Sequence, residues 1–442
     1  MKSIYLSLII FSLSAVMYSQ AGHIMQGVGS VNMSMGGAST AQPLDISGAL
    51  QWNPAAISTF DQKILKFDIG AFFSAPELSS TVPEFNNLGQ PTGNFFSGTT
   101  EDDKGVSPMP ALAMVWGKED SKHTFGASAF GISGFGVTFP ESMTNPINMP
   151  QSMGGFGLIE SDYMLLQVGL TYAYEVTDKL SIGIQPTLNY ASLELAPNPT
   201  ANPNASGYPS TDKATTFGFG AQFGVFYDSG FGLKLGASYK TAQKFGEFVF
   251  DNTYLDNSTN TNSFRMDYPA ILSLGFGYST GDVDLALDFR RVDYENTDGF
   301  STTGWTQTGS VSGFGWKNIN VLSAGLQYKG IKKLPLRFGY TYSSNPIGQD
   351  VAFFNIPATA IIKDAFQFGL SYEVSDKLCI DAVYHHGASD GATSGQLLNP
   401  FFAQAYPPYG AIPGSEVSYE MTTDLIMVGF SYTFKKSEKA ID

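Results

Sequence analysis

The chain of 442 residues carries 24 Lys and Arg and 39 Asp and Glu, so only 14% of it is charged, against roughly a quarter in ordinary soluble domains. Glycine (48 residues) and aromatic residues (14%) are in excess instead, so something other than charge must cover the surface of the protein. A net charge of −15 at pH 7 repels phosphates and, with no basic stripe in the sequence, excludes nucleic acid as a partner.

The first 21 residues have the features of a secretory signal peptide. Lys2 precedes an apolar run over residues 4–17, and small and polar residues follow it up to Ala21. We predict that residues 1–21 are removed, with cleavage near residues 19–21. No later apolar run reaches 18 residues, which excludes membrane-spanning helices from the mature chain. The single cysteine, Cys379, cannot form an internal disulfide, so an exported chain must take its stability from a large core or an extensive sheet.

Residues 22–62 lack a regular apolar period. Six glycines, from Gly22 to Gly48, interrupt short apolar pieces, and residues 44–50 have the pattern of a short helix. Such a segment has too little apolar periodicity to form a domain of its own. Placed before the first strand of a barrel, it is predicted to fold into the lumen as an N-terminal hatch, or plug.

From residue 63 onward, apolar and polar residues alternate with period two, which predicts β-strands. Leu166, Val168 and Leu170, for example, alternate with Gln167 and Gly169. Turns of one to four residues alternate with loops of 14 to 32 residues, so each strand pair is an antiparallel hairpin and all long loops lie at one end. The fourteen predicted strands are residues 63–74, 107–117, 122–137, 161–176, 179–195, 214–228, 231–242, 264–280, 282–295, 317–330, 334–346, 361–375, 377–388 and 416–434.

A soluble β-sandwich also gives this alternation, but three features favour a membrane barrel. The face opposite the apolar one carries Gly, Ser, Thr, Gln, Arg and Glu, which suits a hydrated lumen. The strands are 11 to 19 residues long, whereas those of soluble sheets are usually ~5 to 6. Their number is even, as in outer-membrane barrels, and closure leaves no unpaired edge in lipid. We predict an all-β fold: a 14-stranded antiparallel transmembrane β-barrel over residues 63–434 in the outer membrane of a Gram-negative bacterium, with the hatch (22–62) in its lumen and a C-terminal tail (435–442).

The last predicted strand ends in the aromatic residue Phe434. This ending resembles the signal by which outer-membrane proteins are recognised for assembly, and it predicts the barrel assembly machinery and outer-membrane lipid as partners of a monomeric barrel. Eight residues follow Phe434, whereas the usual pattern ends on the aromatic residue. Pro186, inside the fifth strand, cannot donate to the ladder and predicts a bulge there.

Several short motifs occur together in this chain. They are Gly27-Val28-Gly29, Gly36-Gly37-Ala38, Asp45, Gly48, Asn53-Pro54-Ala55, and residues 155–157 leading into 162–167. With the fourteen strands that follow the hatch, these motifs resemble the FadL/TodX (OMPP1) family of outer-membrane transporters of long-chain fatty acids and hydrocarbons. The resemblance covers essentially the whole mature chain.

The resemblance implies passive uptake of a hydrophobic molecule that is captured at the extracellular loops, gated by the hatch and released laterally through a kink in the third strand. It assigns gating to the hatch residues Gly36, Gly37, Asn53, Pro54 and Ala55. The candidate kink comprises Gly131, Gly134 and Gly136, since glycine inside a strand commonly marks a bulge. A tolerant glycine-rich strand without a kink is the alternative.

Two long loops carry the candidate residues for ligand capture. The loop 138–160 is rich in Met, which adapts to varied apolar shapes, and the loop 389–415 could form the facing wall. The candidates are Met149, Met153, Phe156, Leu158, Phe401 and Phe402. Self-packed loops without a ligand are the alternative. Arg290 and Arg337 lie near inward positions and are candidates for contact with a ligand head group, ion pairs within the lumen being the alternative.

Nothing in the sequence supports catalysis. Of the four histidines, only His385 and His386 are adjacent, and neighbours on a strand face opposite ways. No G-x-S-x-G turn, metal motif or phosphate-binding glycine loop is present, so we expect no enzyme activity, metal or cofactor. The predicted function is a passive channel for hydrophobic molecules. The alternatives are a structural or adhesive barrel whose long loops bind external surfaces and a hydrophilic porin, which the hatch would block.

Overall fold

The structure, a computed structural model, describes residues 22–86, 91–117 and 119–434. The predicted signal peptide (residues 1–21) and the predicted C-terminal tail (residues 435–442) lie outside the described residues. Within the described part of the chain, no helix has the length and apolar character needed to cross a membrane.

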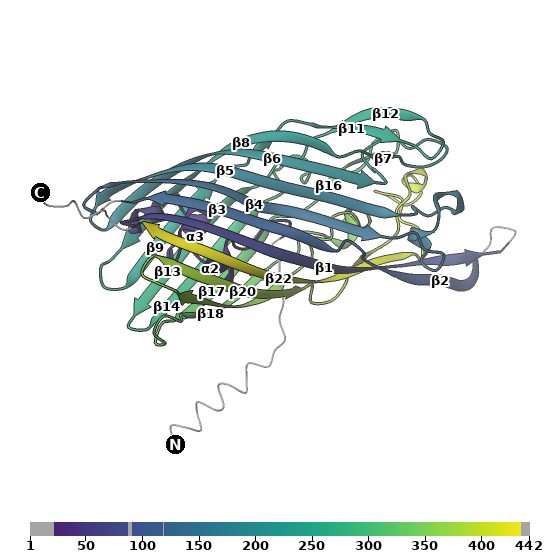
Figure 1. Cartoon of the computed structure of the whole chain (residues 1–442). Helices are drawn as coiled ribbons and strands as arrows, with labels where there is room; N and C mark the ends of the chain where they lie inside the picture. Colours follow the sequence, from purple (N-terminus) through teal and green to yellow (C-terminus); the bar gives the residue numbers. More distant parts are fainter. Residues whose placement is uncertain (1–21, 87–90, 118, 435–442) are drawn as a thin grey trace, which may run out of the picture.

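Fourteen long strands of the described residues close into one antiparallel barrel, as the alternation predicts (Figure 1). Each strand pairs with the next along the barrel, and the first pairs with the last from Lys63↔Phe434 to Thr81↔Glu416. Closure satisfies backbone N–H and C=O groups that lipid could not. The strands are β1(Lys63–Phe85), β3(Val106–Trp116), β4(His123–Phe139), β5(Ile159–Thr177), β6(Leu180–Ala196), β8(Ala214–Asp228), β9(Leu233–Lys240), β13(Ala270–Thr280), β14(Val283–Asp293), β17(Ile319–Tyr328), β18(Leu336–Ser343), β19(Asp364–Glu373), β20(Leu378–Ala388) and β22(Glu416–Phe434).

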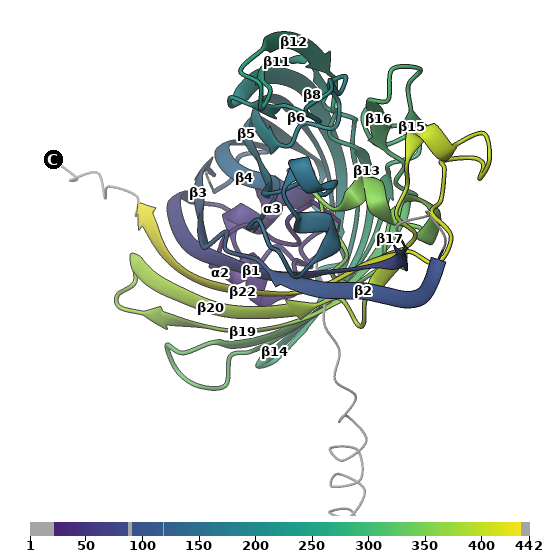
Figure 2. The same cartoon turned by 90° about the vertical axis from the view of Figure 1, so that its right-hand side faces the viewer.

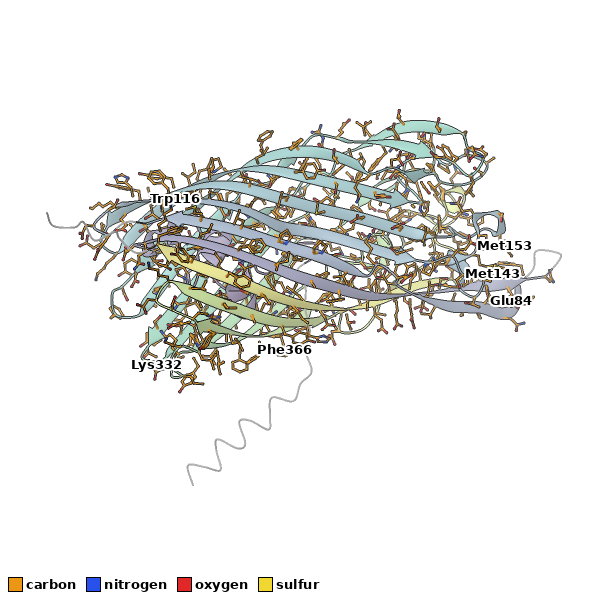
Figure 3. The ribbon with its side chains drawn as sticks, viewed as in Figure 1. Glu84, Trp116, Met143, Met153, Lys332 and Phe366 are labelled. Atoms are coloured by element: carbon orange, nitrogen blue, oxygen red, sulfur yellow. The ribbon has the colours of Figure 1, made fainter. Side chains whose placement is uncertain are left out.

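The outer face of the barrel is apolar and the inner face is small or polar. Leu170 and Phe366 are 64% and 44% exposed, and Figure 3 shows Phe366 on the outside of the wall. Their neighbours Gly169 and Gln367 are buried on the inside. Such an apolar belt is stable where lipid replaces water. The period-two pattern therefore separates a lipid-facing surface from an inward one.

The short turns and the long loops lie at opposite ends of the barrel. Trp116 and Lys332 mark the turn end, and Glu84, Met143 and Met153 mark the loop end (Figure 3). In outer-membrane barrels the short turns face the periplasm and the longer loops face outward. The loop end is therefore the outward-facing end of the barrel.

Parts of the predicted loops fold as additional strands. β1 continues to Phe85 and pairs with β2(Pro91–Glu101), so the predicted loop 75–106 is mostly a projecting hairpin. Ser79 Oγ lies 2.7 Å from Thr99 Oγ1, whereas Phe85 and Phe95 are exposed. Apolar and polar residues therefore do not alternate regularly along the two strands of this hairpin. The other short strands are β7(Ser210–Thr211), β10(Lys244–Phe245), β11(Phe248–Thr253), β12(Thr259–Phe264), β15(Thr303–Trp305), β16(Val311–Phe314) and β21(Thr393–Gly395). Of these, β10 pairs with β8 and β21 pairs with β22 of the barrel.

The bulge predicted at Pro186 is wrong. β6 passes through Pro186↔Ala221 in an unbroken register with β8. On its other side, β6 keeps the same register with β5 before and after the proline. The missing N–H therefore interrupts pairing locally without inserting an extra residue.

The hatch, residues 22–62, lies inside the barrel (Figure 2). It contains α2(Ser30–Ser34), α3(Ile46–Trp52) and the 3-10 helix η1(Pro54–Thr59). Asp45 caps α3 by accepting a hydrogen bond from Gly48 N at 3.0 Å. Asn53 caps η1 by accepting one from Ala55 N at 3.1 Å. These side chains satisfy N–H groups that the helices leave unpaired.

Glycines on the inner face of the wall make room for the hatch. A Cβ atom on Gly183 would overlap the backbone nitrogen of Ala55. One on Gly224 would overlap the side-chain oxygen of Asn53. Atoms of the hatch therefore occupy the space that these inward glycines leave.

Candidate transport site in the barrel wall

The barrel wall is broken between β3 and β4. The two strands pair only over residues 111–116 and 125–130. Beyond that point β3 continues to Val106 beside β1, and β4 continues to Phe139 beside β5. The outer halves of β3 and β4 therefore face each other without a ladder between them.

The candidate kink glycines lie at this break. The ladder between β4 and β5 shifts register between Gly131 and Ser133, which leaves Ile132 as a bulge. Gly134 and Gly136 follow on the part of β4 that no longer pairs with β3. The structure thus brings all three predicted glycines to one interrupted edge.

The start of the hatch pairs with the bulge where β3 does not. Ile24 forms an antiparallel bridge with Ser133. The N–H of Met25 donates to the carbonyl of Ile132 at 3.0 Å, and Ser133 Oγ donates to the carbonyl of His23 at 2.9 Å. These bonds satisfy groups that the bulge withdraws from the ladder.

A cavity of about 310 Å³ occupies the break. Its lining is largely apolar and combines the hatch with the wall on both sides of the gap. It includes Met25, Phe72, Met109, Phe135 and Met164. A hydrophobic molecule could therefore be accommodated between the interior and the lipid.

Charged side chains also line this cavity. Lys213 Nζ lies 2.6 Å from Asp162 Oδ2, and this hydrogen bond raises the pKa of Lys213. Lys104 Nζ donates to the carbonyl of Ser161 at 2.9 Å and lies 3.9 Å from Asp162 Oδ1. Both lysines therefore share Asp162, and Lys213 Nζ also lies 3.8 Å from Glu194 Oε2.

Two carboxylates of the wall hold the hatch. Asp68 Oδ1 accepts from Ser30 N at 2.9 Å and from Ser30 Oγ at 2.6 Å. Asp288 Oδ2 accepts from Ser39 N at 2.9 Å, Thr40 N at 3.0 Å and Thr40 Oγ1 at 2.7 Å. Hydrogen bonds to an ionised acceptor are among the stronger ones. The hatch is therefore anchored to opposite parts of the sheet.

Lys66 joins the hatch to the wall through an ion cluster. Its Nζ lies 2.7 Å from Asp381, 3.1 Å from Asp45 and 3.8 Å from Asp68. Asp45 belongs to the hatch, whereas Asp68 and Asp381 belong to β1 and β20. Lys66 is only 1% exposed, so the cluster is shielded from solvent.

The predicted gating glycines contact the wall through their backbones. The carbonyl of Gly36 accepts from Thr341 Oγ1 at 2.9 Å. The carbonyl of Gly37 accepts from Arg290 at 2.6 Å. Both glycines have φ in the left-handed region, at 67° and 77°, where other residues are strained.

Asn53, Pro54 and Ala55 also lie at the interface with the wall. Asn53 Nδ2 donates to the carbonyl of Thr40 at 2.8 Å and to that of Val225 at 3.0 Å. Pro54 and Ala55 pack on the inward glycines of β6 and β8. All five predicted gating residues therefore lie where the hatch contacts the wall, and their role in gating stays a prediction.

The outer loops enclose a second, apolar cavity of about 50 Å³. Of the predicted capture residues, Phe156 lines it, together with Trp305, Phe353, Phe354 and Ile356. The short helices of these loops are η2(Pro146–Asn148), η3(Gln151–Met153), η4(Gln349–Asn355) and η5(Pro400–Phe402). A wider groove of about 1280 Å³ leads outward and is lined by Phe156 and Phe401.

The other four capture candidates line neither the apolar cavity nor the wider groove in the described structure. Met153, Leu158 and Phe402 are exposed. Met149 is half-buried, and its carbonyl accepts from Gly157 N at 2.8 Å. Its part of the loop therefore packs on itself, which was the alternative interpretation.

Neither candidate arginine lies at the outer cavity. Arg290 is 2% exposed and pairs with Asp288 at 2.7 Å. Its guanidinium lies 3.7 Å over the Trp52 ring of the hatch. Arg337 Nε donates to Gln327 Oε1 at 2.7 Å. Contact of Arg290 with a ligand head group would first require the hatch to move.

Two prolines, which the alternation does not reveal, also lie at the break. Pro108 and Pro110 lie on the part of β3 that pairs with β1 but not with β4, and they have no N–H to donate to a neighbouring strand. The signal was available in the sequence, because two prolines two residues apart inside a strand point to a weakened edge.

A closed barrel of fourteen strands with a hatch in its lumen defines the class of plugged outer-membrane barrels. Residues 13–435 match the family described as outer membrane protein transport protein (OMPP1/FadL/TodX), and the chain belongs to this family. The resemblance noted in the sequence, the fold and the outer-membrane location are thereby confirmed. No curated protein sequence matches the chain.

Solved structures share this fold at low sequence identity. The P. putida toluene transporter TodX has a TM-score of 0.67 at 18% identity, over 93% of this chain and 100% of its own. A Pseudomonas aeruginosa FadL homologue has a TM-score of 0.71 at 15% identity, over 94% and 100%. The Ralstonia pickettii toluene transporter TbuX has a TM-score of 0.62 at 17% identity, over 93% and 99%.

Proposed function

We propose that this protein is a passive channel that takes up long-chain fatty acids or hydrocarbons through the outer membrane. The ligand is captured between the outer loops, passes a hatch that moves, and leaves sideways through the break between β3 and β4. Family membership and the toluene transporters of the same fold support a hydrophobic ligand. The protein acts as a monomer, assembled by the barrel assembly machinery and surrounded by outer-membrane lipid.

The observation that carries the proposal is the end of β3–β4 pairing at Ala111↔Phe130. Elsewhere an unpaired stretch of two wall strands would be costly in lipid. Here a largely apolar cavity and the start of the hatch occupy the unpaired stretch. The break therefore has the features of a built opening.

Lateral exit also has an energetic rationale. Burial of each CH₂ contributes ~0.8 kcal/mol, so a chain of about 16 carbons would lose roughly 10 kcal/mol on release into water. Exit into the bilayer retains that burial. The protein then needs only to exchange one apolar enclosure for another.

Gly131→Leu is expected to block delivery. A Cβ on Gly131 lies 3.9 Å from Met109 Cε and from the Pro110 carbonyl, so a larger side chain enters the break without a backbone clash. We expect transfer of a labelled long-chain fatty acid or of toluene into the membrane to fall about tenfold or more. The measurement is probe uptake by cells or proteoliposomes, with surface binding measured in parallel.

Two controls accompany this variant. Gly131→Ala adds one methyl group, and Leu170→Phe adds bulk on the lipid-facing side of β5, where Leu170 is 64% exposed. Both should transport normally. Undiminished delivery through a correctly folded Gly131→Leu barrel would rule out lateral exit by this route.

Phe156→Ala is expected to weaken capture. The ring lines the apolar cavity between the loops, and loss of its contacts should weaken binding of the labelled fatty acid about tenfold, or 1.4 kcal/mol. Equilibrium binding to the purified protein measures this. Met143→Ala is the matched control, because Met143 is 59% exposed on the same loop. Equal affinities of the two variants would contradict capture at this cavity.

A further inference from the structure

The side chain of His23, at the start of the hatch, is enclosed by aromatic rings. Six of them lie with centroids 4.9 to 6.5 Å from the imidazole. His23 is 1% exposed. We call these six residues the aromatic box: Phe135, Tyr163, Tyr268, Tyr294, Phe300 and Trp316.

The box has the shape of a slot for one flat ring. The imidazole of His23 stacks on Phe300 at 4.9 Å with an interplanar angle of 28°. Tyr268 and Trp316 meet it edge-on, at 67° and 65°. Stacking on one face with edge contacts around it is the preferred arrangement of aromatic groups. A flexible alkyl chain would leave much of this surface without contact.

The box offers more hydrogen-bonding capacity than His23 uses. His23 Nδ1 lies 2.8 Å from the Tyr294 hydroxyl. The hydroxyls of Tyr163 and Tyr268 and the Nε2 of His23 are buried and have no hydrogen-bond partner in the described structure. An unpaired buried hydroxyl is costly, and phenylalanine would pack the same space without that cost. Two tyrosine hydroxyls in an apolar box therefore point to a polar guest.

The box adjoins the break in the wall. Phe135 and Tyr163 belong to the box and also line the cavity between β3 and β4. The backbone of His23 is held there by the bulge, through Ser133 Oγ at 2.9 Å and Gly134 N at 3.2 Å. Withdrawal of this short segment would empty the box and open it to that cavity.

The ring that occupies the box is uncharged. Burial without a compensating carboxylate lowers the pKa of His23 to about 3, so the imidazole is neutral at physiological pH. The surroundings therefore disfavour an ammonium ion, although aromatic cages elsewhere often bind cations.

We propose that the aromatic box is a binding site for an uncharged single aromatic ring that bears a hydroxyl group, and that His23 occupies it as an internal substitute until the N-terminal segment withdraws. The hydroxyl pairs with the tyrosine hydroxyls that His23 leaves unpaired, while the ring takes the place of the imidazole. The inference rests on the proposed function in one respect: the box is treated as a binding site along the route by which the ligand crosses the barrel.

Binding of p-cresol to the purified full-length barrel in detergent tests this assignment, with toluene as the probe that lacks the hydroxyl. His23→Ala vacates the slot and should bind p-cresol about tenfold more tightly than the wild type does. It should also prefer p-cresol to toluene. Tyr163→Phe and Tyr268→Phe, each introduced into His23→Ala, should reduce that preference and leave toluene affinity unchanged.

Two further variants keep the test decisive. His23→Phe fills the slot with an apolar ring and should lose p-cresol binding even if His23→Ala does not fold. His123→Ala is the matched control, because His123 stacks on Tyr172 at the turn end, outside the box. Equal p-cresol affinity in all histidine variants, or toluene bound as tightly as p-cresol, would overturn the assignment.

Failure of the box and failure of the channel are distinguishable. If p-cresol binds as expected but Gly131→Leu transports normally, the box stands and lateral exit fails. If Gly131→Leu blocks delivery but the tyrosine variants leave the preference unchanged, the channel stands and the assignment of the box fails.

Discussion

Asp288→Ala is expected to free the middle of the hatch from the barrel wall. The carboxylate accepts three hydrogen bonds from Ser39 and Thr40 and pairs with Arg290 at 2.7 Å. The substitution leaves those donors and a buried guanidinium unpaired, and hydrogen bonds to charged groups contribute about 1.5–3 kcal/mol. The equilibrium constant for opening of this segment of the hatch should therefore increase about 100-fold.

A cysteine at position 39 reports this opening. Ser39 Oγ has no hydrogen-bond partner in the described structure, so Ser39→Cys removes no bond, and the native thiol is removed with Cys379→Ser. The rate of modification by a small maleimide then measures exposure of the hatch. Asp293→Ala is the matched control, since Asp293 lies on the same strand and bonds Asn296 at the loop end. An unchanged rate in Asp288→Ala would show that this anchor does not hold the hatch.

Adding Arg290→Met to Asp288→Ala separates two effects. It removes the unpaired buried charge, so the barrel should regain part of its resistance to denaturant. The hatch donors remain without their acceptor, so thiol modification should stay fast. If both properties recovered together, the accelerated labelling would reflect a damaged barrel and not a freed hatch.

Lys66→Met is expected to destabilise the whole fold. The ammonium is the cation shared by Asp45, Asp68 and Asp381, and its removal leaves three buried carboxylates in mutual repulsion. Breaking a buried pair by removing one partner costs about 3–5 kcal/mol. The loss of stability is measured as the change in the midpoint of unfolding by urea or guanidinium in detergent. The folded fraction is read from the difference in electrophoretic mobility between heated and unheated samples.

Lys63→Met is the matched control for this variant. Lys63 lies on the same strand, but its Nζ sits 4.9 Å over the ring of Phe434 at the turn end. Its replacement should change stability by less than about 1 kcal/mol. Equal unfolding midpoints for the two variants would show that the ion cluster contributes little to stability.

Much of the barrel was predictable because its signal is local. A residue's position in a period of two decides whether it faces lipid or the interior, so runs such as residues 166–174 identify strands without knowledge of their partners. The projecting hairpin of β1 and β2 was not predictable in this way, because apolar and polar residues do not alternate regularly along its strands. The prediction of a bulge at Pro186 was wrong for a related reason. The missing N–H of a proline is a local property, whereas the strand register depends on the pairing with both neighbouring strands.

The candidate site was predictable only in part. The glycine run identified the place of the break at Gly131, but the extent of the break depends on where β3 stops pairing. The arginines were candidates for contact with a ligand, and the guanidinium of Arg290 stacks on Trp52 of the hatch. The role of an inward charge depends on which segment fills the lumen, and the spacing of residues within one strand does not contain that information.

The sequence by itself therefore determined the low charge, the apolar belt, the strand number and the presence of a non-alternating plug, because each follows from composition or from residues close together in the chain. Only the tertiary structure decided that inward glycines receive the hatch, that Asp288 holds residues about 250 positions away, and that six distant rings surround His23. Those contacts join segments whose proximity arises only when the sheet closes, so no local pattern encodes them.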